Sequence, residues 1–307
     1  MYLTWIFSIV VSVYALSIGI SGKKHKTLSA CIASSLQLSC HNATDISNTC
    51  CSNYPGGLLL QTQFWDTDPA TGPSDSWTVH GLWPDYCNGS FGQFCDSTRQ
   101  YTNITAILQS FYKAELLDFM QTYWKSDSGT DESFWEHEWN KHGTCISTLE
   151  PRCYENYVPQ QEVAEYFQQV VDLFKTLSTY TILQTANISP SLTKTYTLDQ
   201  IQTAIRQATG HNATVQCGKN NTLDEVWYYF NVRGRAQAGK YVHTNPNGLT
   251  TSCPETGIQY LPKYQRGVPV PDIPAPSAAI LSTTFSLMMM VFSIAVASTV
   301  LSVCEDK

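Results

Sequence analysis

The stretch Phe134-Trp-Glu-His-Glu-Trp-Asn-Lys-His-Gly-Thr-Cys145 gathers ionisable side chains of both signs among bulky aromatic residues. Ser133 and Glu136 have the spacing of a capping box, which predicts a short helix over residues 133–142. Successive helical residues turn by about 100°, so one arc of about 140° holds four ionisable residues, namely His137, Glu138, Lys141 and His142. We therefore expect two imidazoles, a carboxylate and an ammonium group to converge on one surface.

Two other interpretations of this stretch compete with a catalytic one. A zinc-protease site is suggested by its likeness to H-E-x-x-H, but zinc ligands on a helix stand at i and i+4. His137 and His142 are five positions apart, so their rings should diverge by about 140°. An ordinary solvated polar face is the second alternative. The neighbouring Phe134, Trp135 and Trp139 favour instead a partly buried site with shifted pKa values.

A third histidine lies in a second stretch, Trp77-Thr-Val-His-Gly-Leu-Trp-Pro84. Residues 77–80 predict a short strand that stops at Gly81 and Pro84. Histidines from two elements can flank a reacting centre, where one takes a proton while the other gives one. RNA carries its own nucleophile, the 2′-OH, so such a pair with a nearby lysine can cleave RNA without a metal. Aromatic side chains add stacking platforms for unpaired bases.

The rest of the pattern mixes strands and helices. Strands are predicted at 58–65 and 226–232, and helices at 104–124, 162–177 and 197–208. Thr197 and Gln200 form a capping box at the start of the last helix, and Gly210 ends it. Because the elements do not alternate in a regular β-α-β rhythm, the predicted fold class is α+β.

The two histidine-bearing stretches resemble the two active-site segments of the ribonuclease T2 family, in the family's order and spacing. The resemblance covers roughly residues 31–253. It implies the family's α+β fold, with a central antiparallel sheet, flanking helices and five disulfides. It also implies a metal-independent endoribonuclease that cleaves single-stranded RNA to a 2′,3′-cyclic phosphate and then a 3′-phosphate. No cofactor or metal is expected, and we expect a monomer.

The same resemblance implies a role for each ionisable residue of the site. His142 would be the general base that deprotonates the 2′-OH, and His80 the general acid for the leaving 5′-oxygen. His137 would hold the phosphate, while Glu138 and Lys141 would stabilise the pentacoordinate state. All five positions match the family pattern, which argues against a pseudoenzyme. A glycoprotein that binds a partner through this fold without catalysis is the alternative from another functional class.

Two base-binding sites are also implied by the resemblance. Trp83 and Asp85 would form the first, together with Phe91, where fungal-type members often have a tyrosine. Phenylalanine keeps the stacking face and loses the hydroxyl, so the base preference stays open. Phe134 and Gln63 would line the second base site. Ordinary core packing is the alternative for these aromatic residues.

Cysteine usage points to an oxidising compartment. Of 11 cysteines, ten lie between Cys31 and Cys253, and the eleventh is Cys304. An even set favours five disulfides, and the absence of any C-x-x-C pair weakens a zinc alternative. The family resemblance, not the spacing, implies the pairs Cys31–Cys51, Cys40–Cys87, Cys50–Cys153, Cys95–Cys145 and Cys217–Cys253.

Both ends of the chain are apolar. Residues 1–22 are predicted to be a secretory signal peptide, with an uncleaved signal anchor as the alternative. One catalytic domain is expected over 28–265, followed by a proline-rich stalk at 266–277. The uncharged segment 278–303 is long enough to span a membrane, and a GPI signal is its competitor. We expect a protein of the secretory pathway, outside the cell or in a lysosome or vacuole, tethered to a membrane through this segment.

The net charge limits how the protein can bind nucleic acid, and the glycosylation sequons agree with a lumenal location. The chain has 18 Lys+Arg against 25 Asp+Glu, a formal charge of −7, which excludes broad electrostatic coating of nucleic acid. RNA can still be held locally where Lys141 and the three histidines concentrate positive charge, most strongly at low pH, so an acidic optimum is expected. Six N-x-Ser/Thr sequons are typical of a lumenal domain: Asn42, Asn88, Asn103, Asn187, Asn212 and Asn220.

Overall fold

The computed structural model describes residues 31, 36–41, 46, 48–247 and 251–263. All of them belong to the first of two compact units, Met1–Lys263. The predicted signal peptide, stalk and apolar C-terminal segment lie outside the described residues. In the part of the chain that the structure describes, no helix has both the length and the apolar character needed to cross a bilayer.

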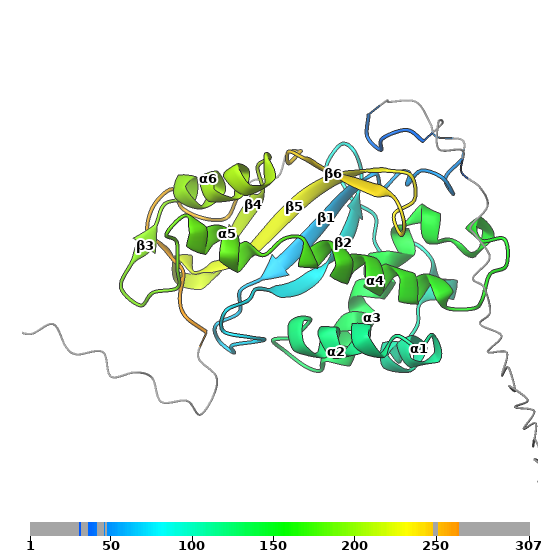
Figure 1. Ribbon diagram of the computed structural model, residues 1–307, viewed down its shortest axis with the longest axis horizontal. Helices are drawn as coiled ribbons and strands as arrows, with labels where there is room; N and C mark the ends of the chain where they lie inside the picture. The colour runs from blue at the N-terminus through cyan, green and yellow to red at the C-terminus, as the bar shows by residue number, and fades with distance from the viewer. Residues whose placement is uncertain (1–30, 32–35, 42–45, 47, 248–250, 264–307) are drawn as a thin grey trace, which may run out of the picture. The chain divides into compact units, whose positions relative to one another are not determined.

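A five-stranded antiparallel sheet forms the centre of the domain (Figure 1). Four strands follow the order β2-β1-β5-β4, and the fifth, β6, also pairs with β5. Their bounds are β1 Leu58–Phe64, β2 Thr78–Asp85, β4 Thr214–Cys217, β5 Leu223–Arg233 and β6 Lys240–Thr244. A second sheet pairs only β3 (Thr195–Tyr196) with β7 (Ile258–Gln259). The α+β prediction is confirmed.

Helices flank this sheet, with α4 lying across it and α1, α2 and α3 grouped together (Figure 1). The helices are α1 Ile104–Ser110, α2 Ala114–Tyr123, α3 Asp131–Lys141, α4 Gln161–Lys175, α5 Thr179–Thr185 and α6 Leu198–Thr209. The capping box of Thr197 and Gln200 is present at the start of α6, and Gly210 ends that helix with φ 79°. Local signals thus predicted α6 correctly.

Two helix predictions need correction. The single helix expected over 104–124 is two helices, because Tyr112 takes a φ of 57° between them, in the left-handed region that ends a helix. Helix α3 begins at Asp131, and its capping box joins Thr130 to Ser133, not Ser133 to Glu136. Glu136 instead accepts a hydrogen bond of 2.6 Å from the Asn103 backbone N–H, which ties α3 to the start of α1.

The strand that carries His80 is longer than predicted. Gly81 and Pro84 do not stop it, because β2 pairs with β1 as far as Asp85. A proline is tolerated there since β2 is an edge strand. Gly81 pairs with Thr62 while Val79 pairs with Gln63, so His80 is an extra residue in a bulge. Bulges re-aim side chains and are frequent beside active sites.

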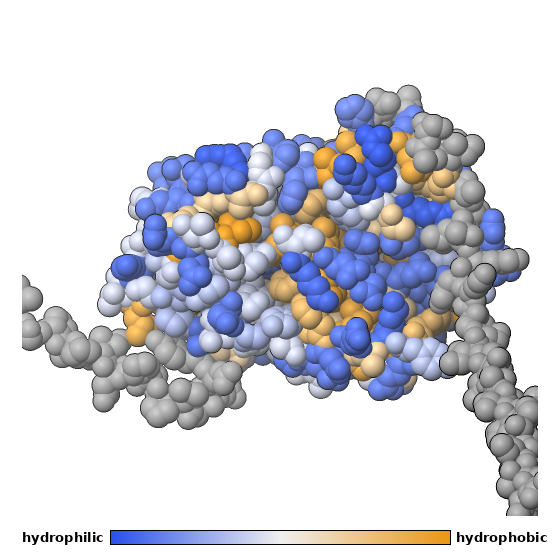
Figure 2. All heavy atoms as spheres, in the orientation of Figure 1, coloured by the Kyte–Doolittle hydropathy of each residue, from blue (hydrophilic) through white to orange (hydrophobic). Residues whose placement is uncertain are grey.

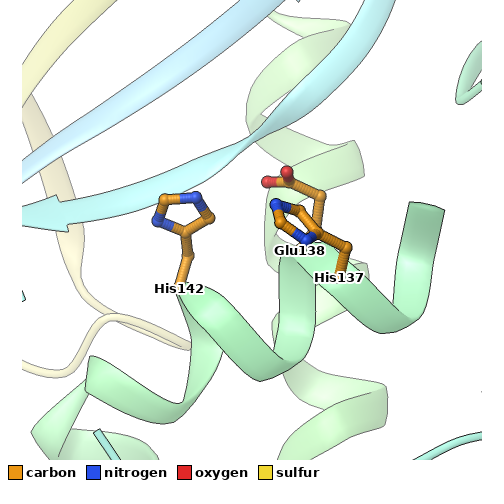
Figure 3. Close-up of side chains that lie close together, drawn as sticks. All are labelled: His137, Glu138 and His142. Carbon is orange, nitrogen blue, oxygen red and sulfur yellow. The ribbon is translucent and has the colours of Figure 1, made fainter. Parts of the chain in front are cut away.

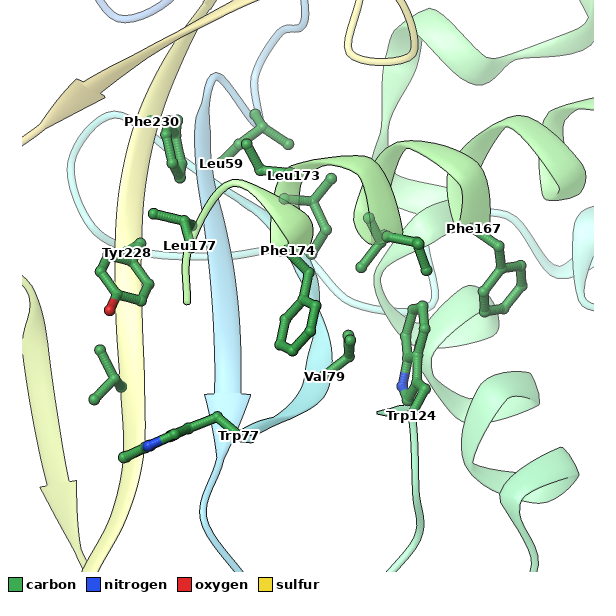
Figure 4. Close-up of a cluster of buried hydrophobic side chains, with 14 of the residues drawn as sticks. Leu59, Trp77, Val79, Trp124, Phe167, Leu173, Phe174, Leu177, Tyr228 and Phe230 are labelled. Carbon is green, nitrogen blue, oxygen red and sulfur yellow. The ribbon is translucent and has the colours of Figure 1, made fainter. Parts of the chain in front are cut away.

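The two faces of the sheet differ because side chains alternate along each strand. One face packs against α4, where Leu173 and Phe174 lie in the main hydrophobic cluster with Leu59 and Val79 of the strands (Figure 4). The other face carries a small buried cluster of Leu58, Leu60 and Tyr229, packed against Trp83 and Trp227. Hydrophilic and apolar side chains are interspersed on the surface shown in Figure 2, as is usual for a globular domain.

Five disulfides join the ten cysteines in the pairs that the family resemblance implied: Cys31–Cys51, Cys40–Cys87, Cys50–Cys153, Cys95–Cys145 and Cys217–Cys253. The Cys95–Cys145 bond closes a loop of 50 residues, which chain-entropy arguments value at about 4 kcal/mol. Because Cys145 follows the end of α3, this bond holds the last turn of that helix against the loop after β2.

Candidate active site

Helix α3 supplies three of the site residues. His137, Glu138 and His142 project from α3 and its C-terminal turn toward a neighbouring strand of the sheet (Figure 3). One ligand atom from each lies within 4.8 Å of the others. The two rings therefore converge, with centroids 6.4 Å apart, and the predicted divergence is wrong. The reason is that α3 ends at Lys141 and the backbone leaves the helix at His142, with φ −111° and ψ −48°.

His80 faces these residues from the bulge in β2. Its Nε2 atom lies 3.6 Å from Glu138 Oε1, and its Nδ1 atom lies 2.5 Å from Glu225 Oε1. The imidazole stacks on Phe64 with a centroid distance of 3.8 Å. His80 is therefore in contact at both ring nitrogens and on one face of the ring, and it lies beside the histidines of α3 with which the sequence analysis paired it.

Glu138 lies fully buried at the centre of the site. Its Oε2 accepts a hydrogen bond of 3.0 Å from Trp83 Nε1, and Oε1 has no hydrogen-bond partner among the described residues. Burial is the main cause that raises the pKa of this carboxyl to about 7. At mildly acidic pH Glu138 is consequently protonated, so it can donate a hydrogen bond to a phosphate oxygen.

His142 has the opposite protonation tendency to Glu138. Its ring is buried and stacks on Trp83, with centroids 4.9 Å apart. Burial first, and then the charges of Lys141, His80 and His137, lower the pKa of His142 to about 2. The Nε2 atom has no hydrogen-bond partner among the described residues. His142 therefore stays neutral in mild acid with a free lone pair, as a general base requires.

His137 is more exposed than His142, and burial and Lys141 lower its pKa too. Lys141 is the last residue of α3, and its positive charge lowers the pKa of both imidazoles. The structure thus brings His80, His137, Glu138, Lys141 and His142 together in one site.

The residues expected at the first base site also lie together. Asp85 is 7% exposed, and burial raises its pKa to about 7. Its backbone forms a bridge with Phe91. Phe91 is 60% exposed, which is incompatible with the core-packing alternative. Trp83, two positions before Asp85 in β2, contacts the histidine cluster through its ring, which stacks on His142, and through its Nε1, which donates to Glu138.

The two residues expected at a second base site, Phe134 and Gln63, lie on different sides of the sheet. Phe134 lies beside His80, with ring centroids 5.7 Å apart. Both line a cavity of about 300 Å³ together with Phe64, Asp66, Lys125, Ser126, Asp127, Ser128, Ser133 and His137. Gln63 does not reach this cavity, and its assignment to the site is wrong. It is fully buried on the opposite face of β1, where it donates to the Leu177 carbonyl (3.0 Å) and accepts from Thr179.

Glu225 is the site residue that the sequence reasoning missed. The predicted strand started at Val226, whereas β5 begins at Leu223 and includes Glu225. Its partner in the neighbouring strand is Phe64, on which His80 stacks. The available signal was an acidic residue two positions before Trp227, on the same face of the strand.

A search of protein-family models matches residues 56–240, more than half of the chain, to the model described as the ribonuclease T2 family. The chain belongs to the ribonuclease T2 family. Ribonuclease Trv of Hypocrea rufa is 56% identical over 230 residues, which make up 75% of this chain and 97% of that protein. A protein called ribonuclease T2-like from Aspergillus fumigatus is also 56% identical, over 75% of this chain and 56% of that protein.

Solved structures agree with this membership. The crystal structure of Actibind, described as a T2 ribonuclease, has a TM-score of 0.74 at 50% identity and covers 78% of this chain and 100% of its own. Human RNase T2 shares the fold, with a TM-score of 0.50 at 24% identity over 67% of this chain and 98% of its own. The chain spans only 56% and 54% of the ribonuclease T2-like proteins of Aspergillus fumigatus and Emericella nidulans.

Proposed function

We propose that this chain is a metal-independent endoribonuclease that cleaves single-stranded RNA by transphosphorylation. The observation that carries the proposal is the pair of histidines on either side of buried Glu138. His142 is kept neutral by burial and neighbouring cations, while His80 lies between two carboxyl groups. Such an unequal pair suits a reaction in which one imidazole accepts a proton and the other donates one.

In the first step, His142 takes the proton of the 2′-OH, and the 2′-oxygen forms a bond to phosphorus. The bond from phosphorus to the 5′-oxygen breaks, and His80 gives a proton to that oxygen. The products are a 2′,3′-cyclic phosphate and a free 5′-hydroxyl. In the second step, water opens the cyclic phosphate to a 3′-phosphate, with His80 as base and His142 as acid.

The remaining residues would stabilise the charge that develops on phosphorus. Protonated Glu138 donates to a non-bridging oxygen through Oε1, the oxygen without a partner among the described residues. Lys141 supplies positive charge, and the exposed His137 binds the phosphate. Donors that are already oriented toward developing charge are typically the largest contribution to catalysis.

Single-stranded RNA is the expected substrate class because the aromatic side chains beside the site can stack only on unpaired bases. Phe91 presents an exposed ring next to Asp85, and Phe134 lines the cavity beside His80. Stacking of one base on an aromatic side chain contributes about 1–3 kcal/mol. Broad electrostatic attraction is not needed for this mode of binding, in agreement with the net charge of −7.

His137, Glu138 and His142 are also close enough to bind one divalent cation. A cation there would occupy the lone pair that His142 needs as a base and the carboxyl group that Glu138 offers to the phosphate. We therefore expect cations to inhibit the reaction instead of supporting it.

We further propose that the protein enters the secretory pathway, since five disulfides form in an oxidising compartment. The five sequon asparagines within the described residues, Asn88, Asn103, Asn187, Asn212 and Asn220, are all exposed, which supports glycosylation. A membrane tether through 278–303 stays a proposal. Mass spectrometry of the mature protein would test it, because the mass of the C-terminal peptide distinguishes a retained segment from a GPI anchor or a free end.

Digestion of defined oligoribonucleotides with EDTA present tests the catalytic proposal. The expected result is cleavage that yields 2′,3′-cyclic phosphate ends first and 3′-phosphate ends later. His80→Ala and His142→Ala should each lose at least about 10²-fold in kcat. Full activity in both variants, or activity that disappears with EDTA, would overturn the mechanism.

A further inference from the structure

We propose that Glu225 is the positioning residue for His80, the carboxylate that sets the tautomer and the orientation of the general acid. This role rests on the ribonuclease function proposed above. Glu225 comes from β5, about 145 residues after His80 in the chain, so only the tertiary structure reveals the pair.

Both oxygens of Glu225 are engaged. Oε1 lies 2.5 Å from His80 Nδ1, and Oε2 accepts a hydrogen bond of 3.1 Å from Trp227 Nε1. The His80 and Glu225 side chains are 17% and 13% exposed, so water competes little for this contact. Phe64 stacks on the face of the imidazole. These contacts leave His80 a single orientation within the bulge of β2.

The chemistry of the contact determines the tautomer. An ionised carboxylate only accepts hydrogen bonds, so the nitrogen that faces it must carry a hydrogen. Glu225 therefore fixes a proton on Nδ1 of His80 in both charge states. Nε2, which lies 3.6 Å from Glu138 Oε1 on the catalytic side, becomes the atom that gains and loses the catalytic proton. A third group that orients a catalytic imidazole in this way is a recurring device in enzymes.

The surroundings of His142 differ from those of His80. Its Nε2 atom has no hydrogen-bond partner within the described part of the chain, and its ring is held by stacking on Trp83. A hydrogen-bond acceptor therefore faces the imidazole of His80, whereas an aromatic ring covers one face of the His142 imidazole. Glu225 thereby helps to decide which histidine serves as acid in the first step.

Substrates with different leaving groups test this role. An ordinary dinucleotide needs an acid to protonate its 5′-oxygen, whereas a nucleoside 3′-(4-nitrophenyl phosphate) releases a stable phenolate without one. Glu225→Gln should lower kcat/KM for the dinucleotide about 10- to 100-fold, part of the effect of a general acid. For the nitrophenyl substrate the expected loss is below about threefold, since acid catalysis contributes little there. His80→Ala should show the same pattern with a larger loss.

Two further variants make the test specific. Trp227→Phe removes the N–H that donates to Glu225 Oε2. This variant should show the same dependence on the leaving group, with a smaller loss of kcat/KM. It replaces Glu225→Gln in the test if that variant fails to fold. Asp224→Asn removes the carboxyl group next to Glu225 on the same strand, which makes no hydrogen bond to His80 among the described contacts. This control should retain activity on both substrates.

Three results would overturn the proposal. Equal losses of Glu225→Gln on both substrates would indicate a role in folding or in another step. Unchanged cleavage of the dinucleotide would show that the contact does not matter. A wild-type protein that cleaves neither substrate would refute the ribonuclease function itself, and the role of Glu225 with it.

Discussion

Replacing Gly81 by alanine is expected to displace the carboxyl group of Glu138. A Cβ atom at this position would lie 1.9 Å from Glu138 Oε2 and 2.9 Å from Trp83 Nε1. Ordinary contact starts at 3.4 Å, so the Glu138 oxygen would have to move by about 1.5 Å. Glu138 is fully buried and cannot turn into solvent. The movement would break its 3.0 Å hydrogen bond with Trp83.

A misplacement of about 1 Å in a catalytic group can cost about 10²-fold in rate, which corresponds to about 2.7 kcal/mol. We therefore expect Gly81→Ala to lose at least about 10²-fold in kcat/KM for dinucleotide cleavage. Overpacking of this kind destabilises a protein by about 1–3 kcal/mol, so the variant should remain folded at 25 °C. Thermal unfolding followed by circular dichroism would separate the two effects.

Gly218→Ala is the matched control for this substitution. Gly218 has a φ of −83°, which alanine adopts without strain. The atom nearest to a Cβ there would be Thr222 Oγ1 at 3.3 Å, and the carboxyl group of Asp224 would lie at ordinary contact distance, 3.6 Å or more. This variant should keep both stability and activity. Wild-type kcat/KM in a folded Gly81→Ala protein would refute the reasoning, because it would mean that the position of Glu138 is not critical.

Three further predictions concern pH, metal ions and base binding. Burial raises the pKa of the Asp85 carboxyl from about 4 to about 7. The favourable contribution of this carboxyl to folding is therefore complete below pH 4 and is lost as the pH rises through 7. In urea titrations, the unfolding free energy of Asp85→Asn should exceed that of wild type by up to about 4 kcal/mol at pH 8 and should equal it at pH 3. EDTA should leave the rate of RNA cleavage unchanged. Added Zn²⁺ should inhibit the wild type more strongly than His137→Ala in the same assay, because His137 is one of the three groups that can bind the ion. Activation by Zn²⁺ would contradict this prediction. Phe91→Ala should lower kcat/KM about 5- to 150-fold through the loss of one stacking contact. Its thermal stability should be unchanged because the Phe91 side chain is 60% exposed. Phe91→Tyr keeps the aromatic ring and should retain the wild-type rate, so an inactive Phe91→Tyr would argue against stacking.

Local patterns in the sequence determined much of this molecule. The capping box of Thr197 and Gln200 marked the start of α6, and Gly210 marked its end. The strand of β1 and the helix of α4 were visible from hydrophobic periodicity. Such signals work because they depend on contacts within one turn or one strand. The two histidine-bearing stretches identified the family, and with it the disulfide pairs.

Helix and strand ends were decided by tertiary contacts. Tyr112 breaks a helix that periodicity would continue, and β2 runs through Gly81 and Pro84 because β1 offers it a partner. The resemblance placed Gln63 at the second base site, but it lies buried on the other face of β1, and the face that a strand residue occupies becomes known only with the pairing register.

The properties that make the site reactive also came only from the fold. The family resemblance of the sequence placed His80, Glu138 and His142 in one site. It did not give the distances between these side chains. The opposite pKa shifts of Glu138 and His142 arise from burial, which depends on what packs around each group. Glu225 reaches His80 only because β5 pairs with β1 and brings distant parts of the chain together. Residue types and their local spacing are properties of the chain, whereas register, burial and long-range contacts exist only once it has folded.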